Sequence, residues 1–313
     1  MSRPNRYAGN NVALARFVPD AKLFRVQPWK NVAALAADWA LIALSFAAAI
    51  RVPHLLVYAF AAVMIARTQL ALGVMMHEAA HGLLMRKRRA NDVCGQILAA
   101  GPLWLSLRTY RAGHLKHHRM PMQHDDPVAR VFGIHDYPIT HARLICRLFA
   151  YACGIGYLMT VLKLIRGDFR LALPKMIKPP ACIAGELASM LAGNGLLFGI
   201  LAYAGHPLLY AGLWLVPSIT LLPLAGQIRA IFEHAGLLPC DDQSQNARTI
   251  VRRSWQTFLF GPHAIHYHIE HHLFVRMPFY NLYAVHRQLA RQGLLPERNL
   301  YAGYGTVLRD VSL

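Results

Sequence analysis

Charged residues, acidic ones above all, are scarce in this sequence. Asp, Glu, Lys and Arg make up 15% of its 313 residues, whereas 55% are hydrophobic. Soluble domains carry about 25% charged residues, so the composition argues against a wholly soluble protein. A membrane protein with a polar portion outside the bilayer fits these numbers better.

Cysteine-based sites and cofactor-binding fingerprints are also missing. The five cysteines form no closely spaced pair, and their odd number argues against a disulfide framework. The sequence has no haem-attachment motif, no cysteine cluster for an iron–sulfur centre and no glycine-rich dinucleotide fingerprint. If the protein carries out redox chemistry, its electrons must come from a separate protein.

The scarcity of acids leaves a net charge of +18, from 33 Lys and Arg against 15 Asp and Glu. The basic residues are scattered among apolar segments and are not gathered into one arm or helix, so we do not expect nucleic acid to be a partner. The first long apolar run begins near Asn31, too far from Met1 for a cleavable signal peptide.

Four apolar segments are long enough to cross a bilayer, which takes about 20 residues. They comprise residues 31–50, 53–76, 182–204 and 207–230. Residues 77–180 and 231–313 are expected to form a helical cap. The positive-inside rule places this cap and both termini in the cytoplasm, and the membrane would be the inner one in a bacterium.

The remaining apolar stretch, residues 141–165, contains interspersed Arg and Lys. We expect it to form helices at the membrane interface or against the cap, with a fifth span as the alternative. Asp38 and Glu186 lie within predicted spans and should face the helix bundle or lie near its ends, because a charge facing lipid is costly. No repeat or linker divides the chain, so residues 1–313 are predicted to be one domain.

Histidine clusters are the feature from which a function can be argued. "HEAAH" at 77–81 fits a zinc hydrolase signature, with two imidazoles one helical turn apart and a glutamate base, but it also fits one corner of a larger histidine cage. His-x-x-His-His occurs twice, as "HLKHH" at 114–118 and at the end of "HYHIEHH" at 266–272. Positions i, i+3 and i+4 share one face of a helix, so each box is predicted to offer three imidazoles to a common point.

The predicted topology brings these boxes together. An even number of crossings separates them, so all lie on one membrane face, where "FEHAG" adds His234 just beyond the fourth span. Eight or nine imidazoles are too many for one ion, because zinc takes only four ligands, and they suit two ions. Imidazole binds zinc, copper, iron and nickel alike, so the ligands alone do not choose the metal.

The segments "HEAAH", "HLKHH" followed by "HDDP", "FEHAG" and "HYHIEHHLFVRMPFYNLYAVH" together resemble the integral-membrane fatty acid desaturase superfamily. The resemblance extends from His77 to His286. It implies an O2-dependent enzyme with two iron ions that desaturates or hydroxylates an unactivated carbon of a fatty acyl or other lipid chain. It also implies an external electron donor, such as a ferredoxin or a small haem protein with its reductase. The expected fold is an all-α integral membrane protein, with four transmembrane helices and a cytoplasmic cap carrying a histidine-rich dimetal site.

The resemblance also assigns roles by position. The implied metal ligands are His77, His81, His114, His117, His118, His234, His268, His271 and His272. Carboxylates near such a site should orient the imidazoles, and the candidates are Glu78, Asp125, Asp126, Glu233 and Glu270. His266 stands where the family often has asparagine, and we expect it to be an added ligand or a hydrogen-bond donor beside the ligands.

Two other classes of protein remain as alternatives. A membrane zinc protease would use His77 and His81 as ligands and Glu78 as general base, but it leaves the other histidines unexplained, and the sequence has no Asp-Gly pair to supply a third ligand. A non-catalytic metal carrier or sensor would need acidic or histidine residues deep inside several spans, where they are sparse.

Overall fold

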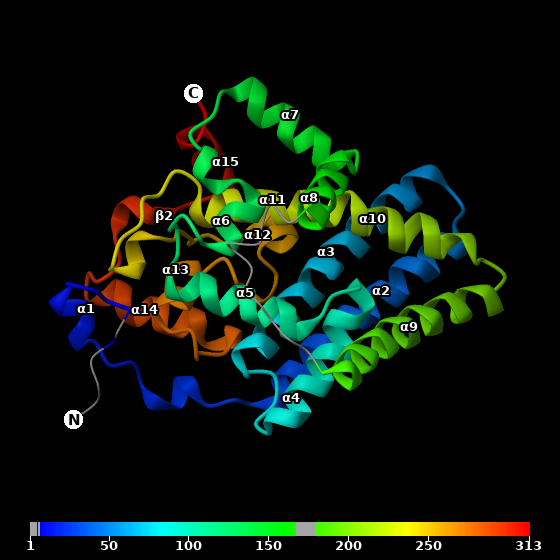
Figure 1. Ribbon diagram of the computed structural model, residues 1–313, viewed down its shortest axis with the longest axis horizontal. Helices are drawn as coiled ribbons and strands as arrows, with labels where there is room; N and C mark the ends of the chain where they lie inside the picture. Colours follow the sequence, from blue (N-terminus) through cyan, green and yellow to red (C-terminus); the bar gives the residue numbers. More distant parts are fainter. Residues whose placement is uncertain (1–4, 6, 167–178) are drawn as a thin grey trace.

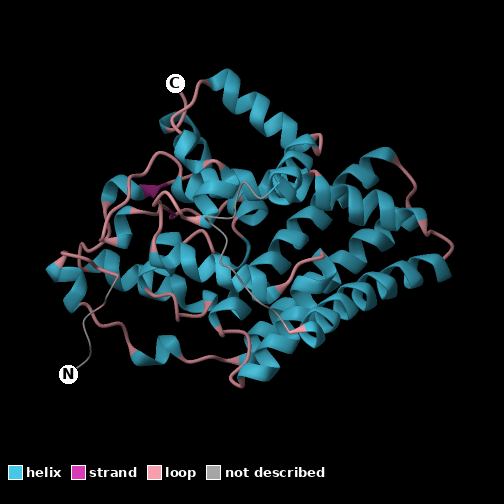
Figure 2. Ribbon diagram, viewed as in Figure 1, coloured by secondary structure: helices cyan, strands magenta, loops and turns pink. Residues whose placement is uncertain are grey.

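The structure is a computed structural model that describes residue 5 and residues 7–166 and 179–313. Helices dominate the described part of the chain, as predicted (Figure 2). One small departure from an all-helical fold is a parallel ladder between strands β1 (Thr249–Ile250) and β2 (Leu300–Tyr301). Residues 167–178, which belong to the predicted cap, lie outside the described residues.

Four helical segments among the described residues are long and apolar enough to cross a membrane, and each overlaps one of the four predicted spans. They are α2 (Pro28–Arg51), α3 (Leu55–His81), α9 (Pro180–Tyr203) and the composite segment Tyr210–His234. The composite segment consists of η5 (Tyr210–Leu215), α10 (Val216–Ile219) and α11 (Leu221–His234). Its break at Thr220 precedes Pro223, which has no N–H to donate to the carbonyl of Ile219.

Shorter elements make up the rest of the described chain. They are α1 (Val12–Arg16), η1 (Ala21–Phe24), α4 (Arg88–Gly95), η2 (Gln96–Ala100), η3 (Gly101–Leu103), α5 (Leu107–Arg119), α6 (Pro127–Phe132), η4 (Ile134–Asp136), α7 (His141–Ala152), α8 (Ile155–Arg166), η6 (Gln243–Gln245), α12 (Trp255–Phe260), η7 (Pro262–Ala264), α13 (His268–Leu273), η8 (Phe279–Asn281), α14 (Leu282–Arg291), η9 (Glu297–Asn299) and α15 (Tyr304–Asp310).

The turns that join the long helices and the two chain termini lie at opposite ends of the molecule. Figure 1 shows the turn between α2 and α3 and the turn after α9 at one end, and both chain termini at the other, among the short helices. Helix α3 packs against both α2 and α11, and it also contacts α5. Either no span or two spans lie between successive histidine segments along the chain. The three segments therefore lie at the same end.

Helices α7 and α8 occupy the apolar stretch that was predicted to be interfacial. Each has 12 residues, and their axes meet at 84°. A helix of that length extends about 18 Å, whereas a bilayer core is about 30 Å thick. Neither helix is long enough to cross a membrane alone, and together they would form a span only with a sharp bend, so both the interfacial interpretation and the fifth span stay predictions.

A buried ion network ties the spans to the cap. Asp38 of α2 is 3% exposed and faces the bundle, as predicted. Its Oδ1 lies 3.4 Å from Nη1 of Arg67 on α3, and its Oδ2 lies 2.7 Å from Nε2 of His263 on η7. Glu186 of α9 is likewise buried. The position of η7, which precedes the third histidine box, is thus linked to the spans.

Substituting Asp38 with Ala should destabilise the protein, because it leaves the Arg67 guanidinium buried without its carboxylate. Breaking such a pair costs about 3–5 kcal/mol. Unfolding in mixed detergent micelles would measure the loss. Asp136→Ala is the control: Asp136 also pairs with an arginine, Arg147, but its side chain is 55% exposed. Removing such a surface pair should cost about 1 kcal/mol or less. Equal losses in the two variants would contradict the prediction.

Candidate metal centre

Four helices deliver the nine predicted ligands. His77 and His81 occupy the last turn of α3, and His234 is the last residue of α11. Helix α5 carries "HLKHH", and α13 carries the third box. Gly82 follows His81 at φ 77°, a left-handed conformation that suits glycine and turns the chain away directly after the ligand. Sequence positions far apart therefore converge because their helices end at, or pass through, one region of the cap.

Five imidazoles form the first cluster, which we term the five-histidine group. Its members are His77, His81, His114, His118 and His271. Neighbouring Nε2 atoms lie 2.9 Å apart between His81 and His114, 2.9 Å between His114 and His118, 3.0 Å between His118 and His271, and 2.9 Å between His271 and His77. Nitrogens bound at right angles to one ion, each at about 2.1 Å, stand about 3.0 Å apart.

Four further imidazoles form the second cluster, which we term the four-histidine group. Its members are His117, His234, His268 and His272. The Nε2 atoms lie 3.0 Å apart between His234 and His268, 3.2 Å between His268 and His272, and 3.3 Å between His272 and His117. The two groups adjoin each other, since the ring centroids of His118 and His272 are 4.5 Å apart.

The division of the boxes between the groups differs from the prediction. We expected each His-x-x-His-His box to offer its three imidazoles to one point. In fact His114 and His118 join the five-histidine group while His117 joins the other, and His271 is separated from His268 and His272 in the same way. Residues i and i+4 lie almost in line along a helix, whereas residue i+3 lies about 100° away from residue i+4. Helices α5 and α13 therefore each serve both groups.

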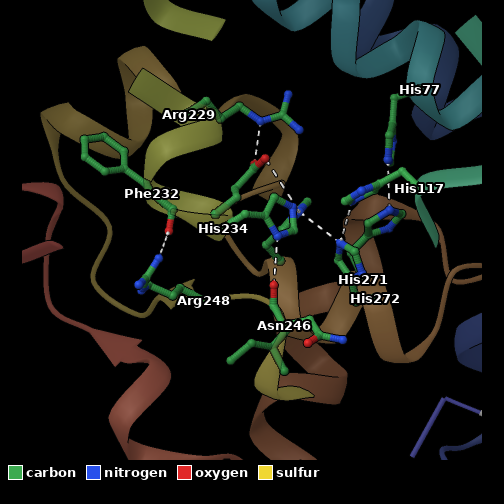
Figure 3. Close-up of polar contacts among 12 residues, drawn as sticks. His77, His117, Arg229, Phe232, His234, Asn246, Arg248, His271 and His272 are labelled. Atoms are coloured by element: carbon green, nitrogen blue, oxygen red, sulfur yellow. Dashed lines mark hydrogen bonds and ion pairs between the residues drawn. The ribbon is translucent and has the colours of Figure 1, made fainter. Parts of the chain in front are cut away.

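Hydrogen bonds on the outer side of three rings fix which nitrogen faces inward. Nδ1 of His117 lies 2.9 Å from both carboxylate oxygens of Asp126, and Nδ1 of His234 donates to the Asn246 carbonyl at 2.8 Å (Figure 3). Nδ1 of His272 donates to Oε1 of Gln243 at 3.3 Å. A backbone carbonyl only accepts, so the proton of a neutral His234 is on Nδ1 and its Nε2 presents a lone pair.

Lone pairs that converge without protons between them repel one another, and a cation at their centre relieves that repulsion. The inward Nε2 atoms, their spacing and their burial fit a metal ion in each group. All nine donors are imidazoles, a set that suits iron, zinc or copper. The residues present are thus able to hold two ions side by side.

Burial also keeps the imidazoles in the form that binds metal. Desolvation lowers the pKa of five histidines outside the spans well below its ordinary value, with further lowering by neighbouring imidazoles. These residues are His114, His118, His268, His271 and His272. Metal binding requires the neutral ring, so the fold supplies the ligands already deprotonated.

We expect the metal-free protein to lose stability as the pH falls below about 6.5, the ordinary histidine pKa. The folded chain keeps these rings neutral, whereas the unfolded chain takes up protons and is favoured by acid. Each such histidine contributes up to about 1.4 kcal/mol per pH unit in this range. Chemical unfolding of metal-free protein at pH 7.5 and pH 5.5 would measure the change. Stability that is constant or rises toward pH 5.5 would refute it.

Two adjacent acids that were predicted together occupy different surroundings. Asp126 is fully buried, caps α6 and accepts from the amides of Met122 at 2.8 Å and Val128 at 2.9 Å. Burial acts to raise the pKa of its carboxyl, but His117 and the Met122 amide outweigh that effect and the pKa is lowered. The Asp125 side chain is 51% exposed and lies beside His124 and Arg130, neither of which is a predicted ligand. In the structure Asp125 therefore contacts the imidazole of His124 and none of the nine predicted ligands.

Glu78 lies on the outer side of the five-histidine group. Its Oε2 accepts from the Phe279 amide at 3.1 Å, and its Oε1 lies 3.5 Å from Nδ1 of His77, the nitrogen that faces away from the group. A hydrolytic base would need to reach water bound at the centre. The geometry therefore argues against Glu78 as the base of a zinc protease.

The other three predicted neighbours of the ligands have other contacts. Glu270 accepts from Oγ1 of Thr249 and from Nδ1 of His286, so it anchors α13 rather than orienting one of the nine imidazoles. His266 belongs to neither group: its Nδ1 donates to the Gly261 carbonyl at 3.2 Å. Glu233 approaches His268 on the Nε2 side, at 3.6 Å, so it does not hold the ring by its outer nitrogen.

Gln243 and Asn246 were not predicted, yet each accepts a hydrogen bond from a ligand ring. Gln243 is buried, accepts from His272 and donates through Nε2 to the His118 carbonyl at 2.8 Å, which links both groups. Asn246 contributes its backbone carbonyl to His234. Both lie in "DDQSQN", a polar run that is typical of an exposed loop. A contact made by a backbone carbonyl, moreover, does not depend on the type of residue and so cannot be predicted from it.

Comparison with known proteins gives two findings. The model of the fatty acid desaturase family matches residues 53–304, which include all nine histidines. A curated relative, the dihydrorhizobitoxine desaturase of Bradyrhizobium elkanii, is 25% identical over 257 residues, covering 80% of this chain and 72% of the relative.

Proposed function

Because the chain belongs to the fatty acid desaturase family, we propose that it is a membrane-embedded diiron enzyme that uses dioxygen to desaturate or hydroxylate an unactivated carbon of a lipid chain. Family membership and the desaturase relative make it an oxidoreductase. The convergence of nine Nε2 atoms in two adjoining groups supports the finer proposal. Iron ions held there would supply the capacity to reduce dioxygen and to take hydrogen from carbon.

The electron balance defines what the chain must receive. Desaturation removes two hydrogen atoms from the substrate, while reduction of one dioxygen to two waters consumes four electrons and four protons. Two electrons and two protons therefore come from outside the substrate. The protein's part is to hold the nine imidazoles with their Nε2 atoms inward. Eight of these nine side chains are buried, which keeps bulk water away from the groups.

We propose that the substrate is a fatty acyl or other lipid chain that enters from the membrane, since the groups lie at the ends of α3 and α11. The relative is named for dihydrorhizobitoxine, so that compound belongs in the assay beside acyl lipids. The net charge of +18 favours an acidic electron carrier, such as a ferredoxin or small haem protein. Equal turnover with a chemical reductant and with every carrier tested would contradict specific docking.

We also propose that residues 1–313 form one domain, with the cap and both termini in the cytoplasm. The even number of spans supports termini on one side, and the arginines and lysines outside the spans favour the cytoplasmic one. Labelling of single cysteines introduced near each terminus would test this. A terminus that reacts only with a reagent outside the cell would overturn the orientation.

Iron counting and product analysis test the proposed function. Metal-free protein should take up two ferrous ions per chain under anaerobic conditions. Supplied with dioxygen and an electron donor, it should then give a product two mass units lighter, or sixteen heavier, than its lipid substrate. Tight binding of a single zinc ion, with no oxidised product from any lipid tested, would overturn the proposal.

Glu78→Gln distinguishes this function from a zinc protease. The glutamine oxygen still accepts from the Phe279 amide, so the fold should persist. We expect lipid oxidation to fall by about tenfold to a hundredfold, the usual effect of changing a residue behind a metal ligand. If the protein instead cleaved peptides, and Glu78→Gln abolished that cleavage with the metal content unchanged, Glu78 would act as the base of a zinc protease. Metal content, lipid oxidation and peptide cleavage, measured on the same sample, decide between the two.

A further inference from the structure

One arginine joins the end of α3 to α5. Arg111 lies one helical turn before His114 on α5. Its Nε donates to the Ala80 carbonyl of α3 at 3.0 Å, and its Nη2 donates to the Ala79 carbonyl at 2.8 Å. Both carbonyls belong to the last turn of α3, where helical partners run out and the helix dipole favours a cation. This contact therefore joins the helix that carries the first histidine box to the helix that carries the second.

Asp92 of α4 holds the guanidinium in one orientation. Its Oδ1 lies 2.6 Å from Nη2 of Arg111 and its Oδ2 lies 3.2 Å from Nη1, and the Arg111 side chain is only 11% exposed. Burial acts to raise the pKa of the Asp92 carboxyl, but hydrogen bonds from Arg111 and Asn91 outweigh that effect and the pKa is lowered. Asn91 also donates through Nδ2 to the Ala79 carbonyl at 2.8 Å. The planar guanidinium thus contacts a carboxylate and two carbonyls at once, which a lysine ammonium is not shaped to do.

The five-histidine group depends on its helices to place its rings. Among the described residues, none forms a hydrogen bond with the buried Nδ1 of His118 or of His271. In the four-histidine group, by contrast, three rings are held by their outer nitrogens. Rings without such bonds take their positions from the backbone that carries them. The separation of α3 and α5 therefore determines whether the Nε2 atoms of His81 and His114, which lie 2.9 Å apart, are able to bind one ion.

We propose that Arg111 is a positioning residue, which sets the distance between His81 and His114 and so allows the five-histidine group to enclose an ion. This inference rests on the proposed dimetal function. The hydrogen bonds of Arg111 go to two carbonyls and a carboxylate, so it acts through the helices and not as a ligand. No member of the four-histidine group lies on α3, and its one member on α5, His117, is held by Asp126. That group should therefore not depend on Arg111.

Cobalt(II) titration of the metal-free, full-length protein tests the assignment, because cobalt absorbance reports the geometry of the ligands without any turnover. The unmodified protein should bind two cobalt ions, and His81→Ala identifies the absorption bands of the five-histidine group. Arg111→Gln should weaken that ion by about tenfold or more, shift its bands and leave the other ion unchanged. Arg108→Gln is the matched control and should behave as the unmodified protein does, because Arg108 lies one helical turn earlier on α5 and is exposed.

Arg111→Lys separates positioning from simple stabilisation of the helix end. Lysine keeps a cation beside the carbonyls of α3, so this variant should fold. It lacks the planar fork that contacts both carbonyls and Asp92 together. We therefore expect the lysine variant still to shift the bands of the five-histidine ion, although less than the glutamine variant does.

The possible results distinguish this role from the others. Normal affinity and normal bands of the five-histidine ion in either Arg111 variant would overturn the assignment, even if thermal stability falls. Equal weakening of both ions, or a lysine variant that does not fold, would also overturn it, because Arg111 would then act through the whole fold. Failure of the unmodified protein to bind two ions would overturn the proposed dimetal function itself, and this inference with it.

Discussion

His271→Ala is expected to abolish lipid oxidation and to remove one of the two ions. His271 is fully buried, and its Nε2 lies between those of His77, at 2.9 Å, and His118, at 3.0 Å. Alanine has no nitrogen that could take the place of the His271 Nε2 between those of His77 and His118. We expect product formation to fall by about a hundredfold or more, which corresponds to at least about 2.7 kcal/mol of lost transition-state stabilisation.

The loss should come from the metal and not from unfolding. Alanine favours the helix of α13, and the substitution leaves Glu270 and its contacts with Thr249 and His286 in place. Added imidazole should enter the vacated space and restore part of the metal binding. His124→Ala is the matched control, because the His124 side chain is 82% exposed and lies outside both groups.

Iron content, circular dichroism and product yield would be measured for the variant and its control. Two tightly bound ions and normal product yield in His271→Ala would contradict the placement of His271 in the five-histidine group. Loss of iron in His124→Ala would show that histidine substitutions in the cap act through the fold.

The large features of this molecule could be predicted because they depend on length and order alone. A run such as residues 31–50 is long enough to span a bilayer, and an even number of spans returns the chain to the same side. These two facts bring "HEAAH", "HLKHH" and "HYHIEHH" to one end without any knowledge of packing. The structure has the same arrangement, with α3 extended as far as His81.

The division of the histidines between two groups could not be predicted in the same way. It depends on how α5 and α13 are rotated between the groups, and that rotation is set by tertiary packing and not by the spacing of the histidines. The direction in which a carboxylate points is equally impossible to predict from the sequence. Glu78 contacts a backbone amide, and Glu233 approaches His268 from the ligand side, although each stands directly beside a histidine in the sequence.

Asp125 and Asp126 illustrate this limit most simply. The sequence gives two neighbouring acids before Pro127, and either could serve a histidine. Only the second caps α6, and the cap directs its carboxylate inward to His117, whereas the first remains at the surface. The two positions therefore provide a variant and its control that differ by one residue in sequence and by burial in the structure.

Asp126→Asn is expected to weaken metal binding at the four-histidine group by about tenfold to a hundredfold, the usual effect of removing a carboxylate behind a ligand. Asparagine caps helices as well as aspartate does, so α6 should remain intact. Its amide, however, is able to donate to Nδ1 of His117, which moves the ring proton to Nε2 and blocks the inward lone pair.

Competition with a chelator would measure the affinity of each ion in Asp126→Asn, and product yield would be followed in parallel. The exposed neighbour is the control: Asp125→Asn should stay within about twofold of the unmodified protein, because surface ion pairs contribute little. The five-histidine ion should keep its affinity in both variants. Equal weakening by the two substitutions would mean that general charge, and not the hydrogen bond to His117, governs metal affinity. A selective loss in Asp126→Asn would show instead that this hydrogen bond keeps the His117 lone pair directed inward.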